Sequence, residues 1–285
     1  MLTALSSAVS GLDAYQQQMD IIGNNIANLN TTAFKSATGN LVDSFSDTLQ
    51  AAAAASGTNN ATNAMQIGTG VTTASITSDW SAGVINPTGI SSNLAINGNG
   101  FFVVQDPNTS AQYVTQDGTF SINTNGQLVT STGMLVMGAN TAGSPPSGLG
   151  ALLINTTGMP STSSPTATMT SYSINNQGII TVNLSDGTSF ARGQVLLQNF
   201  TNPQALTSAG NNLYSNTAAA GGLAAPTTPG SSSLGTIQSG ALELSNVDLS
   251  AQMASLITAQ RAFEANSKII TTSDELLQTV VNMKH

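Results

Sequence analysis

The chain contains no cysteine, which excludes disulfide bonds, thiol catalysis and thiolate metal sites. Its single histidine, His285, stands at the end of the chain, where side chains tend to fray. A Ser/His/Asp triad would need this residue as its base, and an imidazole metal site would need it as a ligand. We therefore predict no catalytic residue, no metal and no cofactor. A pair of catalytic carboxylates among the 13 acidic residues is left open.

Charged residues are also scarce. Five basic and 13 acidic residues make up 6% of the 285-residue chain, against roughly 25% in an ordinary globular protein. The surface must therefore be covered mainly by Ser, Thr, Asn, Gln and Gly. With so few cations and a net charge of −8, the chain has no means to neutralise a run of phosphates, so a nucleic-acid partner is not expected.

A long apolar run is missing as well. No stretch is long enough to span a bilayer, and the first 20 residues lack the basic start and the unbroken apolar core of a secretory signal. We expect neither membrane insertion nor export through the Sec route. The cytoplasm and a signal-less export route remain.

The N-terminal segment carries an apolar stripe with helical spacing. From Leu2 onward, apolar residues recur every three or four positions, which predicts one amphipathic helix roughly 40 Å long within residues 1–35. The stripe includes Leu5, Val9, Leu12, Met19, Ile22, Ile26 and Leu29. Four asparagines crowd its end, at positions 24, 25, 28 and 30. Because Asn is a poor helix former that bonds locally to the backbone, we expect a turn near Thr31.

The C-terminal segment, residues 241–285, carries a second helical pattern. Ser245 to Asp248 resembles a capping box, and it precedes five apolar residues spaced seven apart: Leu249, Leu256, Phe263, Ile270 and Leu277. The intervening heptad positions begin with Met253 and end with Val281, but they hold Gln260, Ser267 and Asp274 between them. A self-contained coiled coil rarely tolerates a seam that is half polar. Two helices packed on the body of one globular domain is the plainer interpretation.

The middle of the chain has the sequence pattern of β-strands. Short alternating runs are separated by Asn-Gly and Asp-Gly pairs, such as Asn97-Gly98 and Asp117-Gly118, which favour tight hairpins. We predict an α+β, mainly β fold, with a central antiparallel β-rich domain over residues 67–240 between long terminal helices that form a coiled-coil-like layer. Residues 36–66 are interpreted as a linker, and 141–170 as a variable low-complexity segment.

Five blocks in order resemble the bacterial flagellar rod and hook family. The segment IGNNIANLNTTAFK matches the N-terminal signature A-N-x-x-T-x-x-F-K, with Ala33 where the family usually has Gly. The segment from Gly240 to Lys284 resembles the C-terminal helix of the family, and NLAINGNGFFVV, QDGTFSINTNGQL and ARGQVLLQNFTNPQAL resemble its β motifs. The matching motif residues are Asn24, Asn25, Ala27, Asn28, Thr31, Phe34, Lys35, Ser245, Asn246, Val247, Gln260, Arg261 and Asn266.

The resemblance implies a structural subunit rather than an enzyme. In this family the terminal helices form an inner tube around an export channel and contact neighbouring subunits, and the β domain lies outside. It implies a helical homopolymer, contact with other axial proteins (distal rod, hook cap and hook–filament junction), and passage through the flagellar type III export apparatus to an extracellular location in the basal body or hook.

The motif details look more like the hook protein, the flexible joint that transmits torque, whereas the length fits the distal rod protein, which stays the alternative. A secreted β-rich adhesin or a glycan-active enzyme would share the hairpins and the low charge, but it would not require heptads at both ends of the chain.

Overall fold

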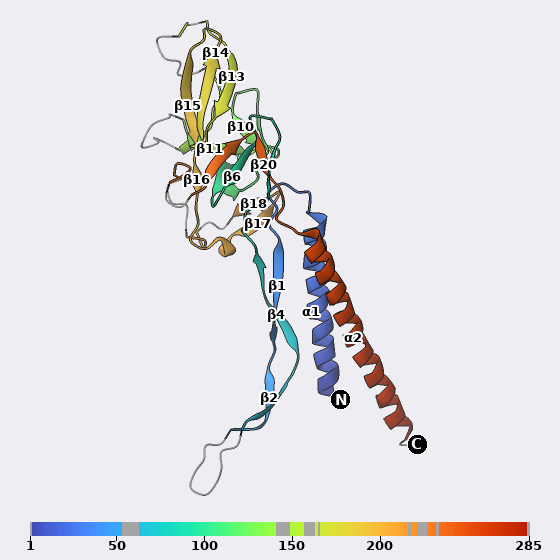
Figure 1. The fold of residues 1–285 in the computed structure, drawn as a ribbon. Helices are drawn as coiled ribbons and strands as arrows, with labels where there is room; N and C mark the ends of the chain where they lie inside the picture. The colour runs from blue at the N-terminus through green and yellow to red at the C-terminus, as the bar shows by residue number, and fades with distance from the viewer. Residues whose placement is uncertain are drawn as a thin grey trace. The chain divides into compact units, whose positions relative to one another are not determined.

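The structure is a computed structural model that describes residues 2–52, 63–140, 149–156, 163–164, 166–215, 218–221, 227–231 and 234–283. By its internal contacts the chain divides into two compact units. The helical unit comprises residues 1–29, 36–79 and 247–285, and the β unit comprises residues 30–35 and 80–246. The short segment 30–35 thus lies in the β unit, although both segments that flank it belong to the helical unit. Figure 1 shows the elements of both units.

Two long helices dominate the helical unit. The helix α1 (Leu2–Ala27) and the helix α2 (Leu249–Asn282) lie side by side and antiparallel (Figure 1). Asp248 caps the second helix, because its carboxylate accepts hydrogen bonds from the backbone N–H groups of Ser250 and Ala251. The predicted capping box, which begins at Ser245, places the start of this helix three residues too early.

Small side chains are prominent among the buried residues of the two helices. Ala8, Gly11 and Ala14 are buried on α1, and Ala259 is buried on α2. Between the apolar heptad residues, one row of partly or fully buried α2 positions is 252, 259, 266 and 273, which hold Gln, Ala, Asn and Ser, and Ser255 and Ala262 are partly buried as well. The sequence analysis had placed this second row one residue later, at 253 to 281, where the side chains are exposed. The two fully buried positions of this row hold the small residues Ala259 and Ser273, which allow close packing of the helix backbone. Supercoiling of the pair stays a prediction.

The helical unit also contains two ribbons of paired strands. Strand β1 (Ala37–Asp43) pairs with β4 (Val71–Ser78), and β2 (Ser46–Gln50) pairs with β3 (Met65–Gly68), both antiparallel. The predicted linker 36–66 is therefore partly strand, and β4 lies outside the β unit to which the sequence analysis had assigned it. Alanine-rich, low-complexity neighbours hid these strands from sequence analysis. Most of that low-complexity stretch, residues 53–62, lies outside the described residues.

The β unit is built from many short antiparallel strands. Its main sheet follows the order β13-β14-β15-β11-β7-β8-β18-β17, with β9, β10, β12 and β16 joined to its side. The elements of this sheet are β7 (Phe101–Gln105), β8 (Gln112–Thr115), β9 (Phe120–Ile122), β10 (Leu128–Thr130), β11 (Leu135–Ala139), β12 (Leu149–Ala151), β13 (Met169–Ile174), β14 (Ile179–Leu184), β15 (Ser189–Val195), β16 (Leu197–Gln198), β17 (Thr207–Gly210) and β18 (Leu213–Ser215). A short 3-10 helix, η1 (Pro203–Ala205), precedes β17.

The last strands of the β unit pair with its first strands. Strand β19 (Thr236–Ser239) pairs with β6 (Leu94–Asn97), and β20 (Ala241–Glu243) pairs with β5 (Ile85–Pro87). The segment that leads into α2 is therefore fixed to the beginning of the β unit.

The core of the β unit has two parts. The larger cluster gathers aliphatic residues around the fully buried Phe102 and contains residues such as Leu94, Leu128 and Ile180. The smaller cluster, which we call the aromatic cluster, joins the buried Phe101 and Phe200 with aliphatic residues such as Val103, and Trp80 and Tyr214 pack against it. Alternating burial along β14 shows why period-2 patterns indicated strands here. The α+β class, with terminal helices and an antiparallel β domain, is confirmed.

Candidate functional site

The motif residues at the two ends of the chain meet at two places, one in each unit. In the helical unit, Asn25 is buried on α1. Both polar atoms of its side-chain amide bind the backbone of Ala37, the first residue of β1. Its Nδ2 donates to the carbonyl of Ala37 at 2.8 Å, and its Oδ1 accepts from the N–H of Ala37 at 3.0 Å. The same Nδ2 lies 3.2 Å from Oε1 of Gln252 on α2. One asparagine therefore joins both helices to the β ribbon.

The turn that follows α1 is where the sequence predicts it. Residues 28–33 form turns and a bend, and the Nδ2 of Asn28 donates to the carbonyl of Asn24 at 2.9 Å, which closes the end of the helix. Ala33 adopts a left-handed backbone with φ of 53° and is 2% exposed. This is the position where the family usually has glycine, the residue that adopts such a φ without steric cost.

Lys35 forms a buried ion pair with Glu243 in the β unit. Its Nζ lies 2.6 Å from Oε1 of Glu243, and the two side chains are 2% and 3% exposed. The ammonium group also donates to the carbonyl of Ser81 at 2.9 Å, and the carboxylate accepts from the N–H of Gly83 at 2.8 Å. These extra hydrogen bonds compensate the desolvation that makes an isolated buried charge costly. The N-terminal and C-terminal motifs are thus joined directly.

The rest of segment 30–35 is held by three parts of the β unit. The hydroxyl of Thr32 donates to the carboxylate of Asp117 at 3.0 Å, and its carbonyl accepts from Nδ2 of Asn212 at 2.7 Å. The N–H of Ala33 donates to the carbonyl of Glu243 at 2.9 Å. We call the segment 30–35 with these partners the junction. The sequence analysis named Thr31, Phe34 and Lys35 of this segment as motif residues but assigned none of them a partner in the β unit.

The C-terminal motif contributes to the junction through Asn246. Its backbone N–H donates to the carbonyl of Phe34 at 3.3 Å, and its Nδ2 lies 3.3 Å from the carbonyl of Ser81. Val247, the next motif residue, is buried and is the first residue of the C-terminal segment of the helical unit. These motif residues stand next to positions in the sequence where one unit ends and the other begins.

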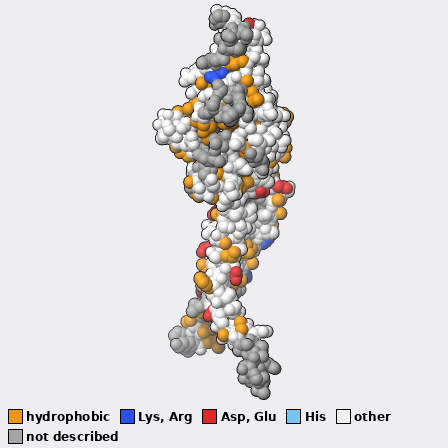
Figure 2. Space-filling view, turned by 90° about the vertical axis from the view of Figure 1, so that its left-hand side faces the viewer, with side chains coloured by type: hydrophobic (Ala, Val, Ile, Leu, Met, Phe, Trp, Pro, Cys, Tyr) orange, Lys and Arg blue, Asp and Glu red, His pale blue; other side chains and the backbone are white. Residues whose placement is uncertain are grey.

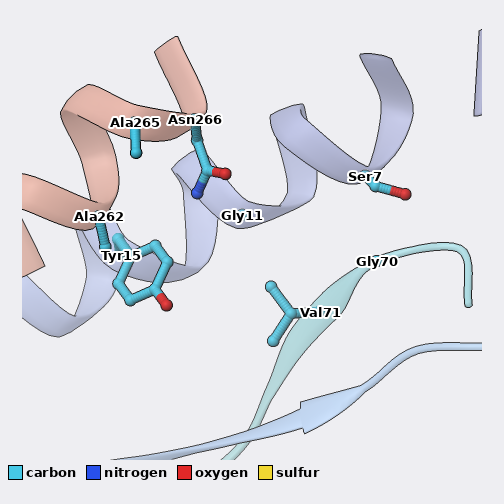
Figure 3. A pocket seen from close by; sticks show the side chains of 8 residues that line it. All are labelled: Ser7, Gly11, Tyr15, Gly70, Val71, Ala262, Ala265 and Asn266. Carbon is cyan, nitrogen blue, oxygen red and sulfur yellow. The ribbon is translucent and has the colours of Figure 1, made fainter. Parts of the chain in front are cut away.

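A groove in the helical unit brings together another motif residue and two glycines. It measures about 380 Å³, and Figure 3 shows the side chain of Asn266 pointing from α2 toward Gly11 on α1. A Cβ atom at Gly11 would lie 2.6 Å from Nδ2 of Asn266, so a larger residue here would push the Asn266 side chain aside. At Gly70, a Cβ atom would clash with the hydroxyl of Ser10, which accepts from the N–H of Val71 at 3.3 Å. The sequence analysis did not single out these glycines, because a glycine within a helical or low-complexity pattern gives no distinct signal of a close contact.

Many predicted assembly residues lie on the surface of the single chain. Ile22 is buried, whereas Leu5, Leu12, Met19, Ile26, Leu29, Leu256, Phe263 and Ile270 are partly buried. The exposed ones are Val9, Leu249, Met253, Leu277 and Val281. Ile257, at 58%, and Met283, at 86%, are exposed as well. The helices therefore carry more apolar surface than they cover by pairing with each other.

Charged side chains are sparse on the remaining surface. Gln260 is exposed, and Arg261 forms an exposed ion pair with Glu264 at 2.9 Å. Figure 2 shows that uncharged side chains and backbone cover most of the face it displays. Within the described ranges, no cluster of His, Cys, Asp and Glu has the arrangement of a metal site, and no helix is long and apolar enough to cross a membrane.

The shifted pKa values belong to turns and to the core rather than to a reaction centre. The N–H of Asn108 and the hydroxyl of Thr109 lower the pKa of Asp106, and the hydroxyl of Thr188 and neighbouring N–H groups lower that of Asp186. Both carboxylates close hairpin loops. Burial raises the pKa of Tyr214 in the aromatic cluster and lowers that of Arg192.

The chain is similar in sequence to known flagellar proteins along its whole length. Three protein-family models fit the chain: "Flagella basal body rod protein" over residues 5–35, "Flagellar hook protein FlgE/F/G D1 domain" over 95–182, and "Flagellar basal body rod FlgEFG protein C-terminal" over 238–283. The flagellar basal-body rod protein FlgG of Bacillus subtilis is 36% identical over 284 residues, which cover 100% of both chains. FlgG of Buchnera aphidicola (subspecies Baizongia pistaciae) is 38% identical over 98% of both chains.

Hook proteins match over shorter stretches. The flagellar hook protein FlgE of Salmonella typhimurium is 41% identical over 116 residues, which cover 41% of this chain and 28% of that protein. The structure of the hook protein FlgE2 of Helicobacter pylori aligns at 13% identity over 64% of this chain and 47% of that chain, with a TM-score of 0.23. The full-length matches and the three family models together show that this chain belongs to the flagellar rod and hook family, whose members are structural proteins of the flagellar axis and not enzymes.

Proposed function

We propose that this chain is a subunit of the distal rod of the flagellar basal body. The single observation that carries this proposal is the full-length match to proteins named as rod proteins, which cover 98–100% of both sequences. The hook protein, our first expectation from sequence, is favoured less, because the hook relative is matched over only 28% of its length. The motif details that suggested a hook lie almost wholly within residues 5–35 and 238–283, which match family models named for basal body rod proteins.

The exposed apolar residues of the helices support assembly by polymerisation. Leu249, Met253 and Ile257 follow one another at intervals of four on α2 and are 41%, 44% and 58% exposed. A monomer gains nothing from this surface, whereas burial against neighbouring copies would contribute roughly 25 cal/mol per Å². With so few charges, this contact should depend only weakly on salt. We infer a tube in which the terminal helices contact neighbouring copies around a central channel.

The junction would hold segment 30–35 firmly within the β unit of each subunit. A rod must resist bending, and this segment is held by a buried ion pair and several partly buried hydrogen bonds. Buried charged bonds of this kind are strong and have few alternative partners. The cluster of motif residues is thus suited to a β unit that keeps its shape under load.

Export and partners follow from the same proposal. We infer that the chain leaves the cell unfolded through the flagellar type III apparatus, guided by its N-terminal region, and then contacts other axial proteins. Deleting residues 1–35 should abolish secretion. Normal levels of the truncated chain in the medium, with lysis excluded, would refute this route.

The assignment to the rod is tested by deleting the gene in the source bacterium and imaging basal bodies by electron cryotomography. We expect basal bodies without the distal rod or anything beyond it, restored by the native gene. A complete rod without a hook would instead identify a hook protein. Complete flagella in the deletion strain would overturn the proposed function altogether.

A further inference from the structure

The two long helices carry few charged residues, and four of these form two pairs of equal length. The only charged residues of α1 are Asp13 and Asp20, which we call the acidic pair. The only basic residues of α2 are Arg261 and Lys268, which we call the basic pair. All four side chains are exposed. The residues of each pair are seven positions apart, which is about 10.5 Å along a helix.

Both pairs lie on the outward faces of their helices. Asp13 is two positions from the buried Gly11, and Arg261 is two positions from the buried Ala259. Two positions correspond to a rotation of about 200° around a helix, so these charges face away from the side on which each helix is buried. The second residue of each pair follows on the same face, because seven residues make nearly two full turns.

The single chain leaves these charges largely unpaired. The ion pairs among the described residues are Lys35–Glu243 and Arg261–Glu264, so the acidic pair and Lys268 take part in none of them. The Arg261–Glu264 pair joins two neighbours on one helix, and its side chains are 77% and 64% exposed. A guanidinium group has five N–H donors, so Arg261 can bind a second carboxylate. Two acids and two bases are therefore open to a partner.

A second copy of the chain offers complementary charges at the right spacing. In a polymer built by rotation and translation along one axis, all copies point the same way. Where the helices follow that axis, α1 of one copy runs opposite to α2 of the next. Antiparallel helices would bring Asp13 opposite Lys268 and, at the same time, Asp20 opposite Arg261. We propose that the acidic pair of one copy binds the basic pair of a neighbouring copy, an inference that rests on the proposed polymer.

These ion pairs set the register of the contact rather than its strength. Exposed ion pairs contribute little free energy, whereas charge complementarity selects one arrangement over others. Apolar residues nearby, such as Val9 and Ile257, which are 42% and 58% exposed, supply the burial. A slide of about one turn would set Asp13 opposite Glu264, where like charges repel. A contact with one favoured register suits a straight rod.

Charge reversal with compensation tests the pairing on the full-length chain. Asp13→Lys sets like charges against each other, and we expect it to raise the critical concentration for polymerisation at low salt at least about threefold, as measured by sedimentation. Adding Lys268→Asp restores opposite charges and should return the value to within about twofold of the native one. The matched control is Asp13→Lys with Arg261→Asp, which has the same net charge but opposes like charges at both positions, and it should not be rescued.

The outcomes separate this proposal from the proposed function. A native chain that polymerises while Asp13→Lys has an unchanged critical concentration would overturn the ion pairs and leave the polymer intact. Equal rescue by the two double variants, or a penalty as large at about 1 M salt as at low salt, would overturn them as well. A native chain that forms no polymer would overturn both proposals. Circular dichroism of each variant confirms that the exposed substitutions leave the monomer folded.

Discussion

Lys35 and Glu243 lie 208 positions apart in the sequence, and their charged groups meet at 2.6 Å in the interior of the β unit. The first belongs to the N-terminal motif and the second to the segment that leads into the C-terminal helix. The β unit is therefore complete only when segments from near both ends of the chain are in place. The Lys35–Glu243 ion pair thus gives this part of the motif a structural role that does not depend on catalysis.

Lys35→Met should destabilise the β unit by about 3–5 kcal/mol, because it leaves the Glu243 carboxylate buried without its counter-charge. Adding Glu243→Gln should recover much of this loss, since the buried charge is then gone and the N–H of Gly83 keeps an acceptor. Urea unfolding followed by the fluorescence of Trp80 measures both effects. Arg261→Met, in an ion pair whose side chains are 77% and 64% exposed, is the control and should cost less than about 1 kcal/mol. A loss below 1 kcal/mol for Lys35→Met would refute this account of the junction.

Ala33 is the position most sensitive to side-chain shape. Its φ of 53° disfavours branched side chains, and the site is buried. Ala33→Val should cost more than about 2 kcal/mol through backbone strain and crowding. Ala33→Gly should stay within about 1 kcal/mol of the native chain, because relief of strain is offset by greater freedom of the unfolded chain. Thermal unfolding of both variants tests this. Equal stability of the Val and Gly variants would contradict the left-handed turn.

Alkaline pH should destabilise the β unit through Tyr214. Burial raises its pKa above the ordinary value of 10.0, so the unfolded chain loses this proton first as the pH rises. Fewer protons are then bound in the unfolded state than in the folded one, and stability falls as the pH rises through and above 10. Tyr214→Phe should flatten this fall, which denaturant midpoints from pH 8 to 11 would reveal. An equally steep fall in the variant would exclude Tyr214 as its source.

Met253→Asp should block assembly without unfolding the monomer. The side chain is 44% exposed, so a charge costs little in the single chain but would be buried between copies. We expect the critical concentration for polymerisation, measured by sedimentation, to rise about tenfold or more. Thr258→Asp adds the same charge at another exposed position of α2 that carries no apolar side chain, and it should assemble far better. Equal assembly of the two variants would remove the Met253 surface from the contact.

The sequence predicts the repetitive parts of the fold well. The spacing of Leu256, Phe263 and Ile270 indicates α2, and turn pairs such as Asn125-Gly126 indicate the hairpins, because these signals are local. The sequence does not predict the details of the contact between the two helices, because the close approach at Gly11 depends on the residue that faces it on the other helix.

The candidate site was predictable only in part. The motif resemblance identifies Lys35 and Asn25, but nothing local assigns them partners more than 200 residues away. The helix cap shows the same limit at short range. Ser245 and Asp248 are both good capping residues. The helix begins after Asp248, whose carboxylate accepts hydrogen bonds from the N–H groups of the first turn.

The arrangement of the polymer tests the central claim most directly. Electron cryomicroscopy of the assembled chain should show a straight tube, with the paired terminal helices lining the channel and the β unit outside. The charge-poor, apolar surface of α2 would then be buried between copies. A curved, flexible tube would identify a hook instead of a rod. A chain that stays monomeric at high concentration while fully folded, or a polymer whose terminal helices lie outside the contacts, would contradict the account.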